Sequence, residues 1–297
     1  MSTKTVQVPH LWGTIAAYHM PHPYDPSKPT LVLVNSFTTD ASLYAAQYAN
    51  PALTSTTNLL AIELLGHGQT RTTTDNWTYW DTAIMNLQVL DALDITGKVF
   101  VLGTSQGGWI TVRMALLRPD RIAGIIPLGT SMDAENARTV ELGCWDGLRL
   151  VGQSVQGFTA AEGTGEAFEP PDEFVRFLID VGFGEEFEGE ERREWEGRIK
   201  ANYTGEEGRK RIRMASVNLR DRDGLHNRLG DVKCPVLWMH GTKDAVYSAK
   251  NAEDEIKLFV NSPDAKLKVV EGGRHFLSWS HPQDVDSAII GFVSRYS

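Results

Sequence analysis

The chain is organised around one stretch, Val99-Phe100-Val101-Leu102-Gly103-Thr104-Ser105-Gln106-Gly107-Gly108-Trp109. Its apolar first half predicts a buried strand, and the apolar residues that follow Gly107 predict a helix, so Ser105 falls in a tight turn between the two. Small residues two before and two after such a serine prevent collisions with the neighbouring strand and helix, and Gly103 and Gly107 occupy these positions. The stretch therefore predicts a nucleophile elbow with Ser105 at a helix N-terminus, whereas an ordinary glycine-rich turn is the alternative interpretation.

The composition fits one large domain or a domain with an insertion, because 297 residues with 41% hydrophobic content can bury a sizeable core. The formal net charge of -9 argues against nucleic-acid and anionic-membrane partners, which require a basic face. The acidic excess is local, since residues 162–196 hold 13 acidic and 3 basic side chains. We interpret this segment as a solvated outer face of helices.

The two cysteines, Cys144 and Cys234, lie far apart and beside apolar residues, which argues against a disulfide framework or a zinc site. The first residues contain no apolar signal-peptide region, and the chain contains no run of 18 apolar residues. We therefore expect a soluble protein of a reducing compartment, the cytoplasm. The sequence leaves open a homodimer.

Apolar runs with the pattern of buried parallel strands alternate with helical periodicity along most of the chain. Two short strands are expected within 5–20. Besides the strand that leads to Ser105, core strands are expected at 30–34, 59–64, 122–128, 234–240 and 265–270. Helices are expected at 77–93, 249–260 and 282–296, and the segment 41–49 is amphipathic. Residues 131–228 interrupt the alternation with polar, glycine-punctuated helical segments that carry scattered aromatics. These patterns predict a doubly wound, mostly parallel α/β sheet formed by 1–130 and 229–297, with 131–228 inserted as a helical cap.

Ligands of such sheets bind at the carboxyl ends of the strands, so partners of Ser105 are sought there. Asp244 follows the predicted strand 234–240, and His275 follows the predicted strand 265–270. A serine needs a base to accept its proton and a carboxylate to orient that base, which makes His275 and Asp244 the candidates. Asp133, which follows the predicted strand 122–128, is the alternative carboxylate.

Over essentially its full length the sequence resembles the α/β-hydrolase superfamily of serine hydrolases, which places nucleophile, acid and base in this chain order. The resemblance rests on Gly103-Thr104-Ser105-Gln106-Gly107-Gly108, Gly66-His67-Gly68, Gly241-Thr242-Lys243-Asp244 and Gly273-Arg274-His275. Asn35-Ser36-Phe37-Thr38-Thr39-Asp40 is similar to the corresponding segment of 3-oxoadipate enol-lactonases, although Thr38 replaces a glycine and the insertion is larger. Glu63 stands where the superfamily usually has a structural aspartate.

The resemblance implies an oxyanion hole made of the backbone N–H groups of Gln106 and Phe37. The sequence shows neither a phosphate-binding glycine loop nor a dinucleotide-binding motif, so we expect no cofactor, and we expect no metal ion. Ser36, Trp109 and Trp145 are candidate substrate contacts, with core packing as the alternative role for Trp109. Trp145 is chosen because it follows the fourth core strand closely and so remains near the active edge.

Three further histidines are interpreted as structural, namely His67 in a turn, His240 beside the acid turn and His281 at a helix start.

The leading functional hypothesis is a cofactor-free serine hydrolase that cleaves a small or medium carboxylic ester or lactone. The same triad also serves thioester hydrolysis, carbon–carbon bond hydrolysis and acyl transfer. A ligand-binding receptor that retains the triad is the hypothesis from a different class, because a fold alone does not determine function.

Overall fold

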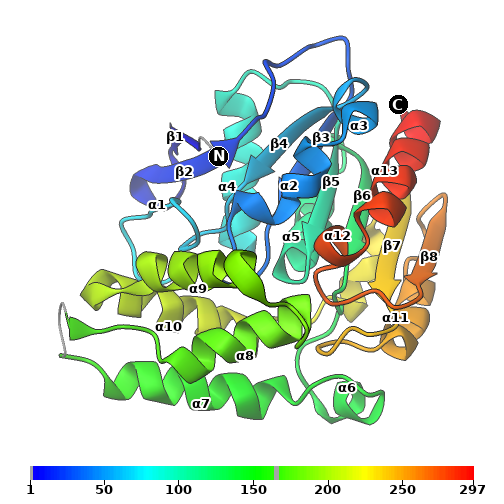
Figure 1. The fold of residues 1–297 in the computed structure, drawn as a ribbon. Coiled ribbons are helices and arrows are strands. Elements are labelled where there is room, and N and C mark those ends of the chain that lie inside the picture. The colour runs from blue at the N-terminus through cyan, green and yellow to red at the C-terminus, as the bar shows by residue number, and fades with distance from the viewer. Residues whose placement is uncertain (1–2, 164–166) are drawn as a thin grey trace.

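The computed structural model describes residues 3–163 and 167–297 and is built on one eight-stranded sheet (Figure 1). The strand order is β1-β2-β4-β3-β5-β6-β7-β8; β2 is antiparallel to both of its neighbours, and all other neighbours are parallel. The strands span Lys4–Val8, Thr14–His19, Thr30–Val34, Asn58–Ile62, Val99–Thr104, Ile122–Leu128, Val236–Gly241 and Ala265–Val270. The predicted fold class, a mostly parallel α/β sheet, is confirmed.

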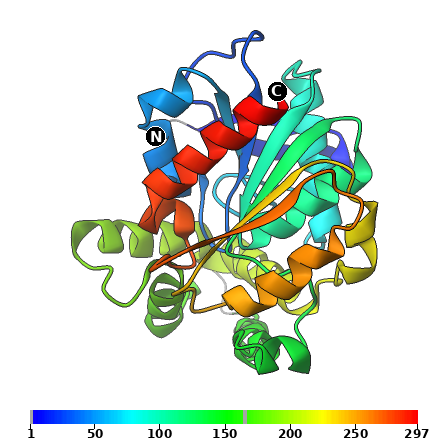
Figure 2. The same cartoon turned by 90° about the vertical axis from the view of Figure 1, so that its right-hand side faces the viewer.

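The central strands β3, β4 and β5 are buried along their whole length, which explains their uninterrupted apolar sequences. Helices α4 and α5 pack on one face of the sheet, and α13 packs with α2 and α3 on the other (Figures 1 and 2). The bounds are Tyr79–Ala92 for α4, Gln106–Leu117 for α5, Pro282–Tyr296 for α13, Ala45–Tyr48 for α2 and Pro51–Thr54 for α3. The short helices α1, α11 and α12 span His10–Gly13, Ala249–Glu255 and Leu277–Ser280, respectively.

Helices α6 to α10 lie between β6 and β7 and form a layer beyond one end of the sheet, the helical insertion (Figure 1). They span Ala137–Glu141, Gly147–Ala160, Asp172–Phe183, Gly189–Tyr203 and Gly205–Asp221. The insertion has its own aromatic core, to which the buried side chains of Phe158, Phe168, Phe183, Trp195 and Tyr203 contribute. The chain leaves and re-enters the sheet domain at adjacent points, because the Leu225 amide donates to the Met132 carbonyl over 2.8 Å.

Three segments differ in detail from their sequence patterns. The segment 41–49 consists of a 3-10 turn over Ala41–Tyr44 followed by α2, and the segment 249–260 changes from α11 to a 3-10 turn after Glu255. Strand β4 ends at Ile62, because the Glu63 carboxylate turns to bind the backbone amides of Ala41 and Gln69. In residues 3–163 and 167–297, no helix has the length and apolar character needed to cross a bilayer.

Candidate active site

Ser105 lies in a sharp turn between β5 and α5, with φ 54° and ψ -113°, a left-handed conformation that strains a residue other than glycine. The turn is possible only because Gly103 and Gly107, which have no side chain, allow close contact between backbone segments. A Cβ atom on Gly103 would lie 2.0 Å from the Gly107 carbonyl oxygen, and one on Gly107 would lie 2.1 Å from the Val34 carbonyl oxygen. The glycine positions of the predicted elbow are therefore required by close packing of β3, β5 and α5.

Asp244 and His275 are carried by the turns that follow β7 and β8, and these turns are locked together. A Cβ atom on Gly241 would lie 2.1 Å from the Gly273 carbonyl oxygen, so the two backbones are in contact at this point. The Lys243 amide also donates to the Gly273 carbonyl oxygen over 2.9 Å. The relative position of the carboxylate and the imidazole is thus fixed by backbone contacts.

The His275 ring faces the Asp244 carboxylate, with Nδ1 at 3.0 Å from Oδ1 and 2.9 Å from Oδ2. The amides of Val246 and Tyr247 donate to Asp244 Oδ1 over 2.8 and 2.9 Å, and His240 Nε2 lies 3.5 Å from Oδ2. Complete burial raises the pKa of Asp244, but the neighbouring His275 and these hydrogen bonds outweigh burial and leave the pKa below its usual value. The carboxylate therefore remains ionised at neutral pH.

Asp133, the alternative acid, is held elsewhere. Its carboxylate accepts hydrogen bonds from Asn136 Nδ2 and from the Ala134 amide, and it lies 3.6 Å from His226 Nδ1. The geometric choice between the two candidate acids therefore falls on Asp244.

A small, partly open cavity of about 30 Å³ lies between Ser105 and the helical insertion. The predicted residues Ser36, Phe37 and Trp145 line it together with Ser105 and His275, whereas Asp244 lies behind the imidazole. The other lining side chains come from the helical insertion and from the turns after β7 and β8, namely Leu178, Val181, Gly182, Leu219, Val246, Tyr247 and Phe276. Tyr247 was missed by the sequence analysis, although its position three residues after Asp244 keeps it at the same edge of the sheet.

Two backbone amides are available near Ser105. Gln106 is the first residue of α5, so its N–H has no partner within the helix, and in the described part of the chain the Phe37 amide donates to no acceptor. The loop that carries Phe37 is strained, since Thr38 has φ 59°. Thr38 stands where the enol-lactonase pattern has glycine, and its hydroxyl donates to the Phe37 carbonyl oxygen over 2.7 Å.

A family model described as the alpha/beta hydrolase family matches residues 31–288. This chain belongs to that family. Solved hydrolase structures agree over nearly the whole chain. An esterase from Exiguobacterium antarcticum covers 98% of this chain and all of its own (TM-score 0.77, 17% identity), and a hydrolase from Pseudomonas aeruginosa covers 98% of each (TM-score 0.77, 22% identity). An enol-lactonase from Burkholderia xenovorans covers 98% of this chain and all of its own (TM-score 0.68, 18% identity).

One curated relative is the dihydrolipoyllysine-residue acetyltransferase component of the acetoin cleaving system of Pseudomonas putida. It is 24% identical over 269 residues, which are 90% of this chain, and the chain spans 64% of the length of that relative.

Trp109 is placed differently from its predicted role as a substrate contact. The alpha/beta hydrolase core encloses this residue, which is 1% exposed and is not among the residues that line the cavity. Its indole N–H donates to the Ser131 carbonyl oxygen, and the Arg222 guanidinium lies 3.7 Å from its ring centroid. Trp109 is therefore a packing residue of this hydrolase core, and we do not retain it as a substrate contact.

A buried ion pair near Trp109 was also missed. Arg222 donates to Glu135 Oε1 over 3.0 Å, and the same oxygen accepts hydrogen bonds from Trp145 Nε1 and the Tyr247 hydroxyl over 3.2 Å each. Glu135 thus holds two aromatic side chains that line the cavity.

The three histidines interpreted as structural have partners of their own. His67 Nδ1 lies 2.9 Å from the Leu65 carbonyl oxygen, and burial lowers the pKa of His67 to about 4. His240 Nε2 lies 2.8 Å from the Tyr247 carbonyl oxygen, and His281 Nδ1 lies 3.1 Å from the Ser280 hydroxyl. In residues 3–163 and 167–297, His, Cys, Asp and Glu side chains form no group of three or more suited to a metal ion.

Proposed function

We propose that this chain is a serine hydrolase that cleaves a carboxylic ester or lactone through an acyl-enzyme, with Ser105 as nucleophile, His275 as base and Asp244 as the orienting acid. The observation that carries the proposal is the His275–Asp244 pair, whose imidazole lines the same small cavity as the strained Ser105. Family membership and the esterases among the similar structures support the same chemistry.

In the first half-reaction, Ser105 Oγ attacks the ester carbonyl carbon while His275 Nε2 accepts the hydroxyl proton. The carbonyl oxygen becomes an oxyanion next to the Gln106 and Phe37 amides, and loss of one such donor typically removes about 3 to 4 kcal/mol of transition-state stabilisation. When the tetrahedral intermediate collapses, the carbon–oxygen bond to the leaving group breaks, and His275 returns the proton to the leaving alkoxide. Asp244 stabilises the imidazolium throughout.

In the second half-reaction, water takes the place of the alcohol. His275 accepts a proton from water, the resulting hydroxide adds to the acyl carbon, and the bond to Ser105 Oγ breaks as His275 reprotonates the serine. The cavity is small and lined mostly by apolar side chains, which limits the water around the reacting groups and strengthens the electrostatic interactions in the site.

The test combines turnover and labelling. Wild-type protein should hydrolyse p-nitrophenyl esters catalytically, and Ser105→Ala should lower the rate by several orders of magnitude without changing the circular dichroism spectrum. A fluorophosphonate probe should attach to Ser105, as mapped by peptide mass spectrometry. Stoichiometric labelling without turnover would instead favour a receptor, and near wild-type turnover by Ser105→Ala would end the proposed mechanism.

Acyl transfer is the second candidate, because the curated relative from Pseudomonas putida is named as an acetyltransferase component. The two reactions share the acyl-enzyme and differ only in the group that attacks it. Product analysis with added alcohols and thiols separates them: a hydrolase releases free acid in their presence, whereas a transferase forms the new ester or thioester.

A further inference from the structure

The cavity at Ser105 is too small for a whole medium-sized ester. Its volume is about 30 Å³, whereas sites that enclose small organic ligands usually measure about 300 to 1,000 Å³. A reacting carboxyl group and one or two carbons fill it. The rest of the substrate must therefore occupy space beyond the cavity walls.

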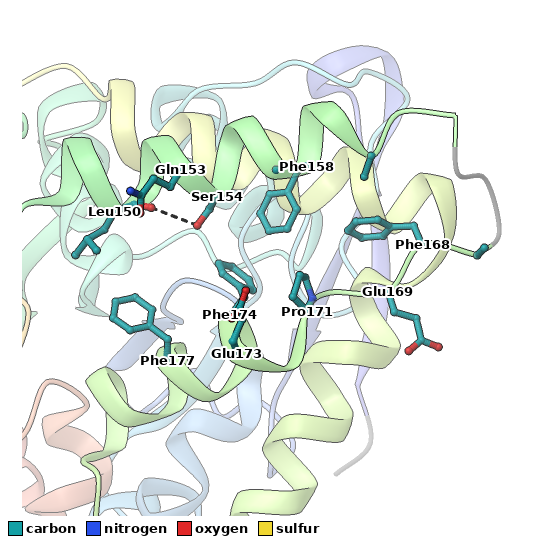
Figure 3. A pocket seen from close by; sticks show the side chains of 13 residues that line it. Leu150, Gln153, Ser154, Phe158, Phe168, Glu169, Pro171, Glu173, Phe174 and Phe177 are labelled. Atoms are coloured by element: carbon teal, nitrogen blue, oxygen red, sulfur yellow. Dashed lines mark hydrogen bonds between the residues drawn. The ribbon is translucent and has the colours of Figure 1, made fainter.

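A much larger space lies in the helical insertion, between α7 and α8. This groove of about 540 Å³ is partly open to solvent and is lined mostly by apolar side chains (Figure 3). Phe158 points from α7 towards Phe174 of α8, with ring centroids 5.1 Å apart, and Phe168 contacts Phe158 edge-on at 6.1 Å. Exposed Phe177 extends this apolar lining towards the sheet domain.

A third space of about 10 Å³, the constriction, lies between the groove and the catalytic cavity. It shares Phe37, Trp145 and Leu178 with the cavity at Ser105. It shares Leu150, Ser154, Phe174 and Phe177 with the groove. The Trp145 and Phe177 rings are stacked at this point, with centroids 6.5 Å apart and planes 10° apart. The three spaces therefore lie in a row from Ser105 to the groove, with these shared side chains as the walls between them.

We propose that small side-chain movements join the three spaces into one path, which binds one straight aliphatic chain of the ester, so that the enzyme selects elongated rather than compact apolar substrates. The proposal rests on the ester hydrolase function proposed above. The constriction favours a polymethylene chain over a branched or ring-shaped group, because it is narrow at the Trp145–Phe177 stack. The exposed carboxylates of Glu169 and Glu173 lie at the groove and disfavour chains that end in an anionic group.

Chain length is the first measurement. Each methylene that leaves water for the path should raise kcat/KM about fourfold until the path is filled. One substrate series varies the acyl chain of p-nitrophenyl esters from acetate to dodecanoate, and a second varies the alkyl chain of alkyl acetates. The series in which kcat/KM rises identifies whether the acyl or the alcohol part of the ester occupies the path.

Two variants block the path at different depths. Ser154→Phe adds a ring at the junction of constriction and groove, where the native hydroxyl only donates to the Leu150 carbonyl of its own helix. Gly157→Phe fills the groove further out, where a new Cβ atom meets no other atom within 4 Å, so this variant should fold normally. Gln156→Phe places the same ring on an exposed position of α7 outside the groove lining and is the matched control.

The expected result is at least a tenfold fall in the octanoate-to-acetate ratio of kcat/KM in both blocking variants, with no change in Gln156→Phe. For the alkyl acetate series, the same ratio is taken between octyl and ethyl acetate. A ratio that stays flat in the wild type, or that is unaffected by both blocking variants, overturns the chain-binding path while leaving the hydrolase proposal intact. Absence of turnover and of fluorophosphonate labelling in the wild type would instead overturn the proposed function itself.

Discussion

Replacing Asp244 with asparagine tests the proposed roles of Asp244 and His275, because the change alters which ring nitrogen of His275 carries the proton. Asp244 Oδ1 accepts two backbone N–H groups, from Val246 and Tyr247, and only an oxygen can keep both hydrogen bonds. In Asp244→Asn the side-chain NH2 group must therefore take the place of Oδ2, which lies 2.9 Å from His275 Nδ1. The oxygen that remains, 3.0 Å from Nδ1, is already shared by the two amides, so the donating NH2 group favours an Nδ1 that accepts and a ring proton on Nε2.

The consequence is an imidazole with the wrong tautomer, which cannot accept a proton from Ser105. A serine protease with the equivalent change loses about 10⁴-fold in kcat, which corresponds to about 5.5 kcal/mol of activation free energy. We expect a loss of this size here, with an unchanged fold, because the backbone contact between Gly241 and Gly273 keeps the two turns in place.

The assay is p-nitrophenyl ester hydrolysis followed to single turnovers, with thermal unfolding as the measure of stability. Asp133→Asn is the matched control and should remain within a few-fold of wild type, since Asp133 binds Asn136 and Ala134 instead. A folded Asp244→Asn variant with less than a tenfold loss, or a larger loss in Asp133→Asn, would refute the assignment of the acid.

Three further predictions concern other parts of the molecule. Trp145→Ala should change KM and the ester preference more than it changes the melting temperature, because the half-buried indole lines the cavity; an unchanged specificity profile across an ester panel would remove it from the site. Gly107→Ala should lower the free energy of unfolding by about 2 kcal/mol or more in urea titrations, because the new Cβ atom would overlap the Val34 carbonyl oxygen. Glu255 lies 2.7 Å from His226 and raises the pKa of this histidine above 6.5, so its stabilising effect is complete below about pH 6.5 and is lost as the pH rises through the folded-state pKa. The melting temperature difference between wild type and His226→Gln should accordingly be larger at pH 6 than at pH 8.5, and equal differences would contradict the pairing.

The sequence predicted correctly those features that are determined by residues close together in the chain. The turn at Ser105 was predictable because the glycines that make it possible lie within two residues of the serine. The last helix matches its predicted bounds, Pro282–Tyr296, because a proline begins it and an apolar stripe continues to its end. Asp244 and His275 came from the general rule that parallel strands bring their carboxyl ends to one edge, and the structure brings the two side chains together there.

Contacts between distant segments could not be read from the sequence. Every residue of α5 from Gln106 to Ala115 is buried, so periodicity does not distinguish a core-facing from a cavity-facing Trp109. The Glu135–Arg222 pair joins residues 87 positions apart, and nothing near either residue indicates the other. The size of the cavity likewise depends on how the helical insertion meets the sheet domain, which no local pattern encodes.

The helical insertion begins and ends at adjacent positions of the sheet domain, so it is attached to that domain like a separate unit. Met132 and Leu225 are joined by a direct backbone hydrogen bond, and Arg222 Nε donates to the Asp133 carbonyl over 3.0 Å. A peptide of a few residues is therefore long enough to connect the two sides in place of the whole insertion. We therefore expect that the sheet domain and the helical insertion can be exchanged separately, and that an insertion from another family member, grafted at these two residues, leaves the strands that precede Ser105, Asp244 and His275 in place.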